Sequence, residues 1–355
     1  MKKHIITIIV IFGLLLSTVA CESGNPDYQP DELTVHFLEL GNKYTGDCVY
    51  INYGDIDIII DAGSKQDSAT TITSYINKYI KDNKLEFVIA THAHEDHIAG
   101  FNSNASGTVV GVLDYFEIDT IIDFPRTNSN TLVYNRYVAT RDKLKANGTA
   151  HYTALQCYKN EDGAQRIYSL GGNVKLEILY NYYYDHASSN ENNYSVAARI
   201  INGTQKYLFT GDLEKSGEDS LVDYYAENHG GLGHHILYKG GHHGSYTSSN
   251  EKLMAEIRPE YVCVCSCVGT TEYTDNLSTI FPSQAFIDRV APYTDKVYLT
   301  TLVTDYTGGL YEPFNGNVVF TARGNDISIQ CSHNNLKLKD TEWFKENKAM
   351  PRFWE

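Results

Sequence analysis

Residues 92–100 of the chain read HAHEDHIAG, and they follow an apolar segment, residues 85–90, that is typical of a buried β-strand. Within this stretch His92, His94, Asp96 and His97 lie within six residues of one another. Imidazole nitrogens and carboxylate oxygens are the ligands that Zn²⁺ accepts, and a loop lets alternating side chains turn toward two neighbouring ions. A polar surface loop seldom carries so dense a cluster, so the stretch predicts a metal centre at the end of a strand.

Further candidate ligands stand at the ends of other predicted strands. Three groups follow apolar segments in this way: Asp61, Asp212 and the pair His242-His243. The histidine pair lies in the glycine-rich sequence KGGHHGS, residues 239–245. Taken alone, an Asp after a Gly is more often a turn residue, and histidines in a glycine-rich loop are more often solvated. Their shared position at strand ends favours convergence on the loop of residues 92–97.

Strand-like and helical segments alternate along most of the chain, which predicts an α/β architecture. Strands are expected at residues 34–40, 47–52, 56–60, 85–90, 118–123, 174–180, 195–201, 206–210, 236–239, 261–268, 296–301 and 318–322. Helices are expected at residues 68–81, 135–146, 216–225, 251–257 and 283–290. No linker-like break divides residues 34–335, so we expect one domain there. A C-terminal tail follows over residues 336–355, and the sequence leaves open whether it docks.

The first 33 residues are predicted to be an export signal and a tether. Lys2 and Lys3 precede a mostly apolar run, residues 5–19, that is shorter than the roughly 20 apolar residues of a membrane span. Thr18-Val-Ala-Cys21 resembles the lipobox of bacterial lipoproteins, in which the cysteine carries the lipid. We therefore expect a signal peptide over residues 1–20, a lipid-anchored tether over 21–33, and an exported, membrane-anchored protein facing the periplasm or the cell exterior.

The chain is strongly acidic. Removing residues 1–20 takes away two lysines and no acid, which leaves 27 basic against 44 acidic residues, a net charge of −17. No cluster of Lys and Arg appears in the sequence. Such a charge disfavours nucleic acid as a partner, because phosphate backbones are held mainly by basic side chains.

Taken together, these features resemble a metallo-β-lactamase-fold hydrolase. The similarity is greatest to the extracytoplasmic hydrolase domain of the competence proteins of the ComEC family and to its stand-alone exported relatives, and it covers nearly all of residues 34–325. The residues that carry it are Gly41, Gly46-Asp47, Asp61-Ala-Gly63, the HAHEDHIAG stretch, Asn192-Asn193-Tyr-Ser195, Thr210-Gly-Asp212, His242-His243-Gly-Ser245, and Arg258-Pro-Glu260 with the strand that ends at Val268-Gly269. The resemblance implies a four-layer αββα sandwich.

The resemblance also implies a set of metal ligands. It assigns His92 and His94 to one ion, Asp96 and His97 to the other, and Asp212 to both as a bridge. His243 completes the second site, with His242 as the alternative ligand. Asp61 is expected to contact a ligand rather than a metal ion. Asp96 and Asp212 are the expected catalytic residues, and the cofactor is two Zn²⁺ ions, with Mn²⁺ as the alternative.

The chain departs from the wider family at two places. The family supplies a further His to the first metal ion, whereas this chain has Asn193 and Ser195 in that region. We therefore expect the first ion to have fewer protein ligands, unless His186 replaces the missing one. The second departure is Phe281-Pro282, where relatives often have His-Pro.

The implied activity is hydrolysis by a hydroxide that bridges two metal ions. We expect a phosphodiesterase or phosphoesterase acting on a small molecule or a polymer, with Lys239 or Ser245 contacting a phosphate oxygen. Two alternatives stay open: a DNA-binding or nuclease accessory of competence, and a metal-containing lipoprotein that binds a ligand without catalysis.

Overall fold

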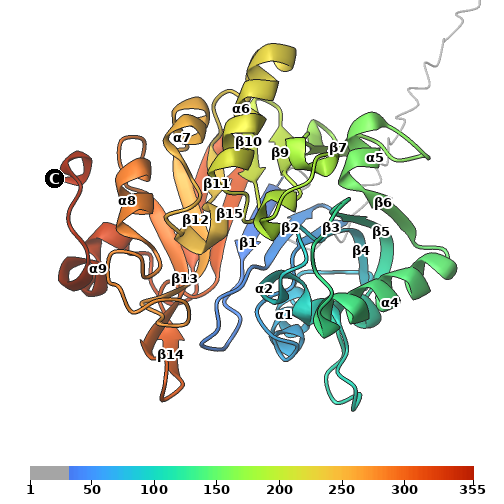
Figure 1. The fold of residues 1–355 in the computed structure, drawn as a ribbon, viewed down its shortest axis with the longest axis horizontal. Helices are drawn as coiled ribbons and strands as arrows, with labels where there is room; N and C mark the ends of the chain where they lie inside the picture. The colour runs from blue at the N-terminus through green and yellow to red at the C-terminus, as the bar shows by residue number, and fades with distance from the viewer. Residues whose placement is uncertain (1–31) are drawn as a thin grey trace, which may run out of the picture. The chain divides into compact units, whose positions relative to one another are not determined.

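Two eight-stranded β-sheets organise residues 32–355, the part of the chain that this computed structural model describes (Figure 1). The predicted signal peptide, Cys21 and nearly all of the predicted tether lie outside these residues. Within the described part, no helix combines the length and the apolar character needed to cross a bilayer.

The first sheet has the strand order β16-β15-β1-β2-β3-β4-β5-β6. Its strands are β1 (Glu32–Phe37), β2 (Val49–Tyr53), β3 (Ile56–Ile60), β4 (Lys84–Ile89), β5 (Glu117–Asp123), β6 (Ala150–Thr153), β15 (Val318–Arg323) and β16 (Asp326–Cys331). Strands β3 to β6 are parallel. Their carboxyl ends therefore meet at one edge of the sheet, which is where the chain continues into Asp61 and His92.

The second sheet has the order β14-β13-β12-β11-β10-β9-β8-β7. Its strands are β7 (Ile167–Gly171), β8 (Val174–Ile178), β9 (Ala198–Asn202), β10 (Gln205–Phe209), β11 (Leu237–Lys239), β12 (Tyr261–Val268), β13 (Val297–Asp305) and β14 (Leu310–Pro313). Strands β10 to β13 are parallel. The loops after β10 and β11 consequently leave the sheet at the same edge, and they carry Asp212 and the His242-His243 pair.

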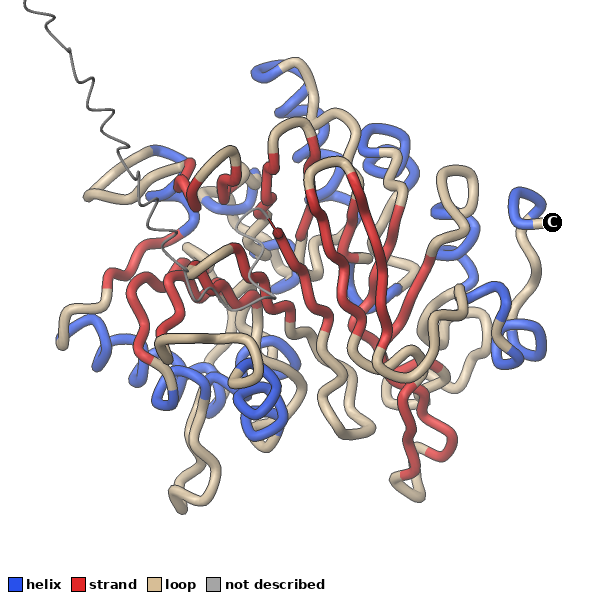
Figure 2. The backbone as a smooth tube through the Cα atoms, turned by 180° about the vertical axis from the view of Figure 1, so that it is seen from behind, coloured by secondary structure: helices blue, strands red, loops and turns tan. Residues whose placement is uncertain are grey.

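Helices cover the outer faces of both sheets (Figure 2). Those beside the first sheet are α1 (Ser68–Ile76), α2 (Glu95–Ile98), α3 (Val112–Tyr115), α4 (Leu132–Ala146) and α5 (Ala154–Lys159). Those beside the second are α6 (Lys215–His229), α7 (Glu251–Ile257), α8 (Gln284–Val290) and α9 (Glu342–Asn347). One apolar cluster joins the sheets, for example Val35 with Phe209 and Cys265, and a second packs α6 to α9 onto the second sheet. The predicted αββα sandwich is confirmed.

Several elements differ from the sequence prediction. The helix expected over residues 68–81 ends at Ile76, and turns continue the chain to Ile80. The strand expected to begin at Ser195 begins at Ala198. Four strands and four α-helices were not expected: β6, β7, β14, β16, α2, α3, α5 and α9. Most of these short strands lie at or beside the edges of the sheets, where many side chains are exposed to solvent. They therefore have no continuous apolar run.

The C-terminal tail docks. Leu338, Phe344 and Trp354 are buried in the cluster on the second sheet. The indole Nε1 of Trp354 donates a hydrogen bond of 2.9 Å to the carbonyl oxygen of Thr294. Residues 336–355 therefore cover part of the domain.

Candidate metal centre

Loops from both sheets bring the candidate ligands together at one edge of the sandwich. The loop after β4 carries His92 and leads into α2, whose first turn holds Asp96 and His97. Asp212 follows β10, and His243 follows β11. The side chains of His92, His97, Asp212 and His243 are buried. Residues far apart in the sequence thus meet in the interior.

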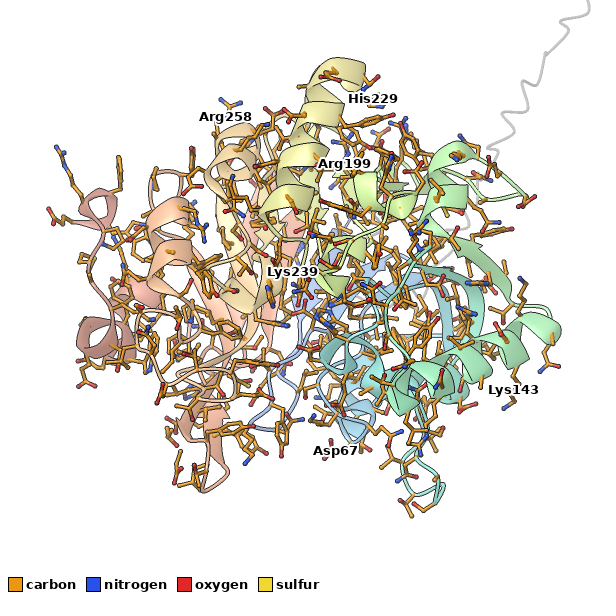
Figure 3. All side chains as sticks on the ribbon, viewed as in Figure 1. Asp67, Lys143, Arg199, His229, Lys239 and Arg258 are labelled. Atoms are coloured by element: carbon orange, nitrogen blue, oxygen red, sulfur yellow. The ribbon has the colours of Figure 1, made fainter. Side chains whose placement is uncertain are left out.

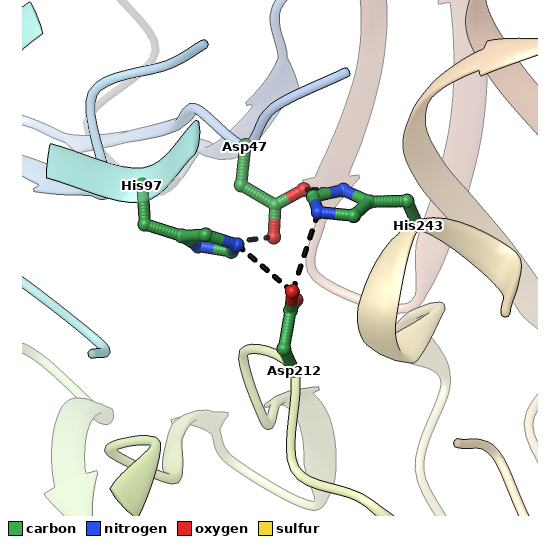
Figure 4. Close-up of side chains that lie close together, drawn as sticks. All are labelled: Asp47, His97, Asp212 and His243. Carbon is green, nitrogen blue, oxygen red and sulfur yellow. Dashed lines mark hydrogen bonds and ion pairs between the residues drawn. The ribbon is translucent and has the colours of Figure 1, made fainter. Parts of the chain in front are cut away.

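Asp212 lies between two imidazoles (Figure 4). Its Oδ2 atom is 3.0 Å from Nε2 of His97 and 3.3 Å from Nε2 of His243. The same nitrogen of His243 is 3.3 Å from Oδ2 of Asp96. One ligand atom each from Asp47, His97, Asp212 and His243 fits within a 4.8 Å span. This placement suits a carboxylate that binds a metal ion together with His97 and His243.

His92 and His94 form a second pair beside this group. Nε2 of His92 lies 3.0 Å from Nδ1 of His94, and the rings of His92 and His97 are 4.2 Å apart. Burial, together with the neighbouring His97 and His94 rings, lowers the pKa of His92 well below its usual range. His92 is therefore neutral, which leaves a nitrogen lone pair for a cation.

Asp61 fixes the orientation of His97. Its Oδ2 atom is 2.7 Å from Nδ1 of His97, and it also accepts from the hydroxyl of Thr91 at 2.7 Å. The backbone N–H of Thr91 donates to Oδ1 at 2.8 Å. Burial opposes protonation of His97, but Asp212 and Asp61 outweigh burial and raise the pKa of His97 well above its usual range. Asp61 thus contacts a predicted ligand and turns Nε2 of His97 toward Asp212.

Asn193 and Ser195 lie in the region where metallo-β-lactamase-fold proteins have an additional His, and only Ser195 contacts the centre. Ser195 Oγ accepts from the backbone N–H of Asp212 at 3.1 Å and lies 3.5 Å from Nδ1 of His92. Asn193 instead donates to Ser216 at 3.2 Å. His186 is exposed and stacks on Tyr182, with ring centroids 3.8 Å apart. The structure therefore brings in Ser195 and leaves His186 outside.

The two adjacent histidines take different positions. His243 is buried against Asp212, whereas His242 is partly exposed, with Nδ1 at 2.8 Å from the hydroxyl of Thr247 and Nε2 at 3.8 Å from Asp212. Both have a left-handed backbone, with φ of 46° for His242 and 54° for His243. Such conformations cost about 1–3 kcal/mol each in residues other than glycine, so surrounding contacts must hold them. The strained turn presents one imidazole to the interior and the other to solvent.

A cleft of about 710 Å³ opens beside the centre. Its lining residues are His94, Glu95, Asp96, Glu214, His242, Ser245, Tyr246, Thr247, Tyr273, Thr274, Thr279 and Phe281. Tyr273 donates from its hydroxyl to Oδ2 of Asp96 at 3.3 Å and packs against Phe281 at 5.6 Å between ring centroids. Ser245 thus lines the cleft, and Phe281 forms part of the same wall.

Lys239 has a different environment from the one expected. Its side chain is 1% exposed and lies in the interior, whereas Lys143 and His229 are at the periphery (Figure 3). Its ammonium group forms an ion pair with Asp47. Burial opposes the charge, but Asp47 and Asp212 raise the pKa of Lys239 above its usual range. The predicted contact with a substrate phosphate does not fit this placement, because the ammonium group is enclosed and already paired.

Asp47 is among the residues that carry the sequence resemblance, but no role in the centre was predicted for it. It is fully buried, and its Oδ1 atom lies 3.1 Å from Nδ1 of His243. Its backbone N–H donates to the carbonyl oxygen of Asp96 at 3.0 Å, and its own carbonyl oxygen accepts from Gly63 at 2.7 Å. The available signal was an acidic residue between Gly46 and the apolar segment that becomes β2, which on its own reads as a turn residue.

The donor set fits divalent cations. Three carboxylates and several imidazoles crowd together, and Oδ1 of Asp212, Nε2 of His243 and both carboxylate oxygens of Asp47 are buried without a hydrogen-bond partner. The Asp47 oxygens face Lys239 and His243 as ion pairs. Buried carboxylates without compensation are costly, and a cation between them would satisfy these atoms. Imidazole nitrogen with carboxylate oxygen suits Zn²⁺ and also Mn²⁺.

Comparison with known proteins agrees with this fold. Residues 41–106 match the sequence model of the family described as Metallo-beta-lactamase superfamily. Competence protein ComA of Neisseria gonorrhoeae is 34% identical over 120 residues, which are 34% of this chain and 15% of that protein. The chain thus spans a small part of the curated relative that it matches.

Two solved structures align with larger parts of the chain. The metallo-beta-lactamase fold protein YhfI from Bacillus subtilis aligns over 79% of this chain and 99% of its own, with 13% identity and a TM-score of 0.43. CmlA, a diiron beta-hydroxylase from Streptomyces venezuelae, aligns over 67% of this chain and 45% of its own, with 12% identity and a TM-score of 0.38.

Proposed function

We propose that this chain, which has the metallo-β-lactamase fold, is an exported metal-dependent hydrolase of phosphodiesters or phosphomonoesters. One observation carries the proposal: Asp212 stands between His97 and His243, beside Asp96, next to a cleft of about 710 Å³. A buried group of metal ligands beside an open cleft is the arrangement that metal-assisted hydrolysis requires.

The residues of the centre have separable roles in this proposal. Two divalent ions bound there would supply Lewis-acid stabilisation of negative charge and a nucleophile from water near neutral pH. His92 and His94 would hold one ion, and Asp96, His97 and His243 the other, with Asp212 between them. Asp61 keeps the Nδ1 proton of His97 in place, so that Nε2 faces Asp212.

The cleft supports a phosphoryl substrate through its hydroxyl groups. Ser245, Thr247, Tyr246 and Tyr273 all line it. Hydroxyl groups can donate to the oxygens of a phosphoryl group, and preorganised donors lower the cost of charge that develops there. Ser245 Oγ lies 3.1 Å from the hydroxyl of Thr247, so the two can present donors side by side. The preference for phosphorus over an acyl carbon otherwise rests on the resemblance of the sequence.

The test measures hydrolysis of bis-p-nitrophenyl phosphate by protein loaded with zinc or manganese. We expect turnover that Asp212→Ala abolishes and that Asp223→Ala, an exposed aspartate paired with Lys252 on the surface, leaves unchanged. A parallel assay with the chromogenic β-lactam nitrocefin examines the acyl alternative. Wild-type turnover no faster than that of Asp212→Ala would contradict the proposal and favour a metal-containing binding protein.

A role in handling nucleic acid is the second candidate, and the match to competence protein ComA favours it. The charge of the chain, −15 at pH 7, and a cleft lined by no Lys or Arg within the described residues weigh against it. An electrophoretic shift assay with single- and double-stranded DNA at low salt decides the matter. Absence of retained DNA at micromolar protein would remove this candidate.

Export and lipid anchoring at Cys21 complete the proposal, and they rest on the sequence of residues 1–21. Labelled palmitate should enter the protein in a bacterial host, and Cys21→Ala should lose the label. Label that persists in the variant, or never enters the wild-type protein, would contradict the anchor and leave the hydrolase proposal unaffected.

A further inference from the structure

We propose that Asp47 positions His243 instead of binding a metal ion, and that Lys239 is the fixed internal counter-ion of the Asp47 carboxylate. The inference concerns the metal centre and does not depend on which ester is hydrolysed. It is carried by the contacts of the two ring nitrogens of His243 and by the burial of the Asp47–Lys239 pair.

The contacts of His243 determine which of its nitrogens can bind a cation. Nδ1 faces two oxygens, Oδ1 of Asp47 and the carbonyl oxygen of Cys265, each at 3.1 Å. Because both are acceptors, Nδ1 must carry a proton. Nε2 is the nitrogen that faces Asp212 and Asp96, each at 3.3 Å. The Cys265 carbonyl oxygen and Asp47 together therefore select the tautomer of His243 whose lone pair points at the other ligands.

Asp61 provides an internal parallel. It contacts Nδ1 of His97 at 2.7 Å, and Nε2 of His97 faces Asp212. Each of the two imidazoles whose Nε2 atom faces Asp212 thus has a buried carboxylate, Asp61 or Asp47, beside its Nδ1 atom. Asp61 leaves the end of β3, and Asp47 enters β2, the strand paired with β3. Asp61 forms a hydrogen bond with its imidazole and Asp47 a slightly longer ion pair, but both carboxylates face Nδ1 of an imidazole whose Nε2 faces Asp212, which is the pattern expected of orienting groups.

Charge distinguishes Asp47 from a ligand. Its carboxylate is fully buried, and so is the Lys239 side chain whose ammonium group pairs with it. The positive charge of Lys239 already compensates the carboxylate. A divalent ion on the same carboxylate would face that ammonium group at short range inside the protein, where repulsion between like charges is screened least.

The pair also connects the two sheets. Lys239 ends β11 of the second sheet and lies four residues before His243, whereas Asp47 precedes β2 of the first sheet. The ion pair therefore sets the position of the loop that carries His243 relative to the first sheet. Removing one partner leaves an uncompensated charge in the interior, whereas removing both charges together leaves a neutral contact.

The experiment compares three variants for zinc binding, measured by competition with a chromogenic chelator. Asp47→Asn keeps an acceptor oxygen for Nδ1 and leaves Lys239 unpaired. Lys239→Met leaves Asp47 unpaired. The double variant is neutral and keeps the acceptor. We expect each single change to weaken zinc binding about 10- to 100-fold. We expect the double variant to bind within about threefold of the wild type, with the same number of zinc ions per chain.

A ligand role for Asp47 predicts a different pattern. The double variant would then lose zinc as severely as Asp47→Asn does. Asp212→Asn, in which a proposed ligand is replaced, gives the size of the loss expected when a ligand is removed. The cobalt(II) absorption spectrum of the double variant would also change in intensity, because the coordination number changes. That result would overturn the proposal, and so would single variants that bind zinc like the wild type or a wild-type protein that binds no zinc. If a single variant does not fold, as judged by circular dichroism, the double variant compared with the wild type and Asp212→Asn still decides.

Discussion

Replacing Asp61 by Ala tests whether one buried carboxylate holds His97 in place. Asp61 accepts three hydrogen bonds, from the backbone N–H and hydroxyl of Thr91 and from Nδ1 of His97. The change leaves the Thr91 N–H buried and unpaired, and it leaves the His97 Nδ1–H with the more distant Thr91 hydroxyl at 3.3 Å. An unpaired buried donor costs about 1–3 kcal/mol, so we expect the free energy of unfolding to fall by about 1–3 kcal/mol.

The same change should weaken metal binding. Nε2 of His97 lies 3.0 Å from Asp212 only while the ring is held from the other side. Loss of such an orienting partner typically weakens metal affinity about 10- to 100-fold, or about 1.4–2.7 kcal/mol. Competition with a chelator measures the affinity, and urea unfolding of the metal-free protein measures stability.

Thr91→Val is the matched control, because it keeps the Asp61 carboxylate and the backbone N–H bond and removes a hydroxyl that donates to Asp61 and also lies 3.2 Å from Nδ1 of His92 and 3.3 Å from Nδ1 of His97. We expect it to lower the free energy of unfolding by about 1 kcal/mol and to leave zinc affinity within threefold of the wild type. If Asp61→Ala binds zinc within twofold of the wild type and loses less than about 0.5 kcal/mol of stability, the role given to Asp61 is refuted.

Other parts of the structure give three further predictions. Burial raises the pKa of Glu218 to about 7, although it accepts hydrogen bonds from Ser249 and Asn250. The folded protein therefore binds this proton more tightly than the unfolded chain, and the free energy of unfolding falls by about 3 kcal/mol as pH rises from 4.5 to 7. Urea unfolding of Glu218→Gln should lack this dependence of stability on pH, and an equal dependence in the variant would contradict the assignment. Tyr273→Phe removes the hydroxyl that bonds to Asp96, so kcat/KM for bis-p-nitrophenyl phosphate should fall about 2- to 10-fold with zinc content unchanged; an unchanged kcat/KM would exclude a role for the hydroxyl. Trp354→Ala empties a buried position of the docked tail and should cost about 3–5 kcal/mol in urea unfolding; a loss below about 0.5 kcal/mol would show that the tail contributes nothing.

The parts of the fold that the sequence predicted are those with a local pattern. Strands such as β4 and β12 are buried on both faces, and each is a run of apolar residues that can be recognised on its own. The edge strands β14 and β16 lack this run, because the side chains of β14 are mostly exposed and those of β16 alternate between exposed and partly buried. The packing of the tail was likewise unpredictable, since it depends on contacts with residues such as Thr294 that lie far away in the sequence.

The candidate site shows the same division. The ligands of residues 92–97 lie in one short stretch and were predicted directly. Asp47 was given no role in the centre, and Lys239 was expected to face a substrate although it is enclosed and paired with Asp47, because each finds its main partner only when the two sheets come together. The choice between His242 and His243 also needed the structure, since it depends on two left-handed backbone angles that adjacent identical residues do not reveal.

Anomalous diffraction at the zinc edge from crystals of the zinc-loaded protein tests the central claim most directly. The account predicts strong peaks within bonding distance of Nε2 of His97, Nε2 of His243 and the carboxylate of Asp212, with a second position beside His92 and His94. Peaks confined to the surface, or the absence of any peak among these residues in a protein that retains its fold, would contradict it.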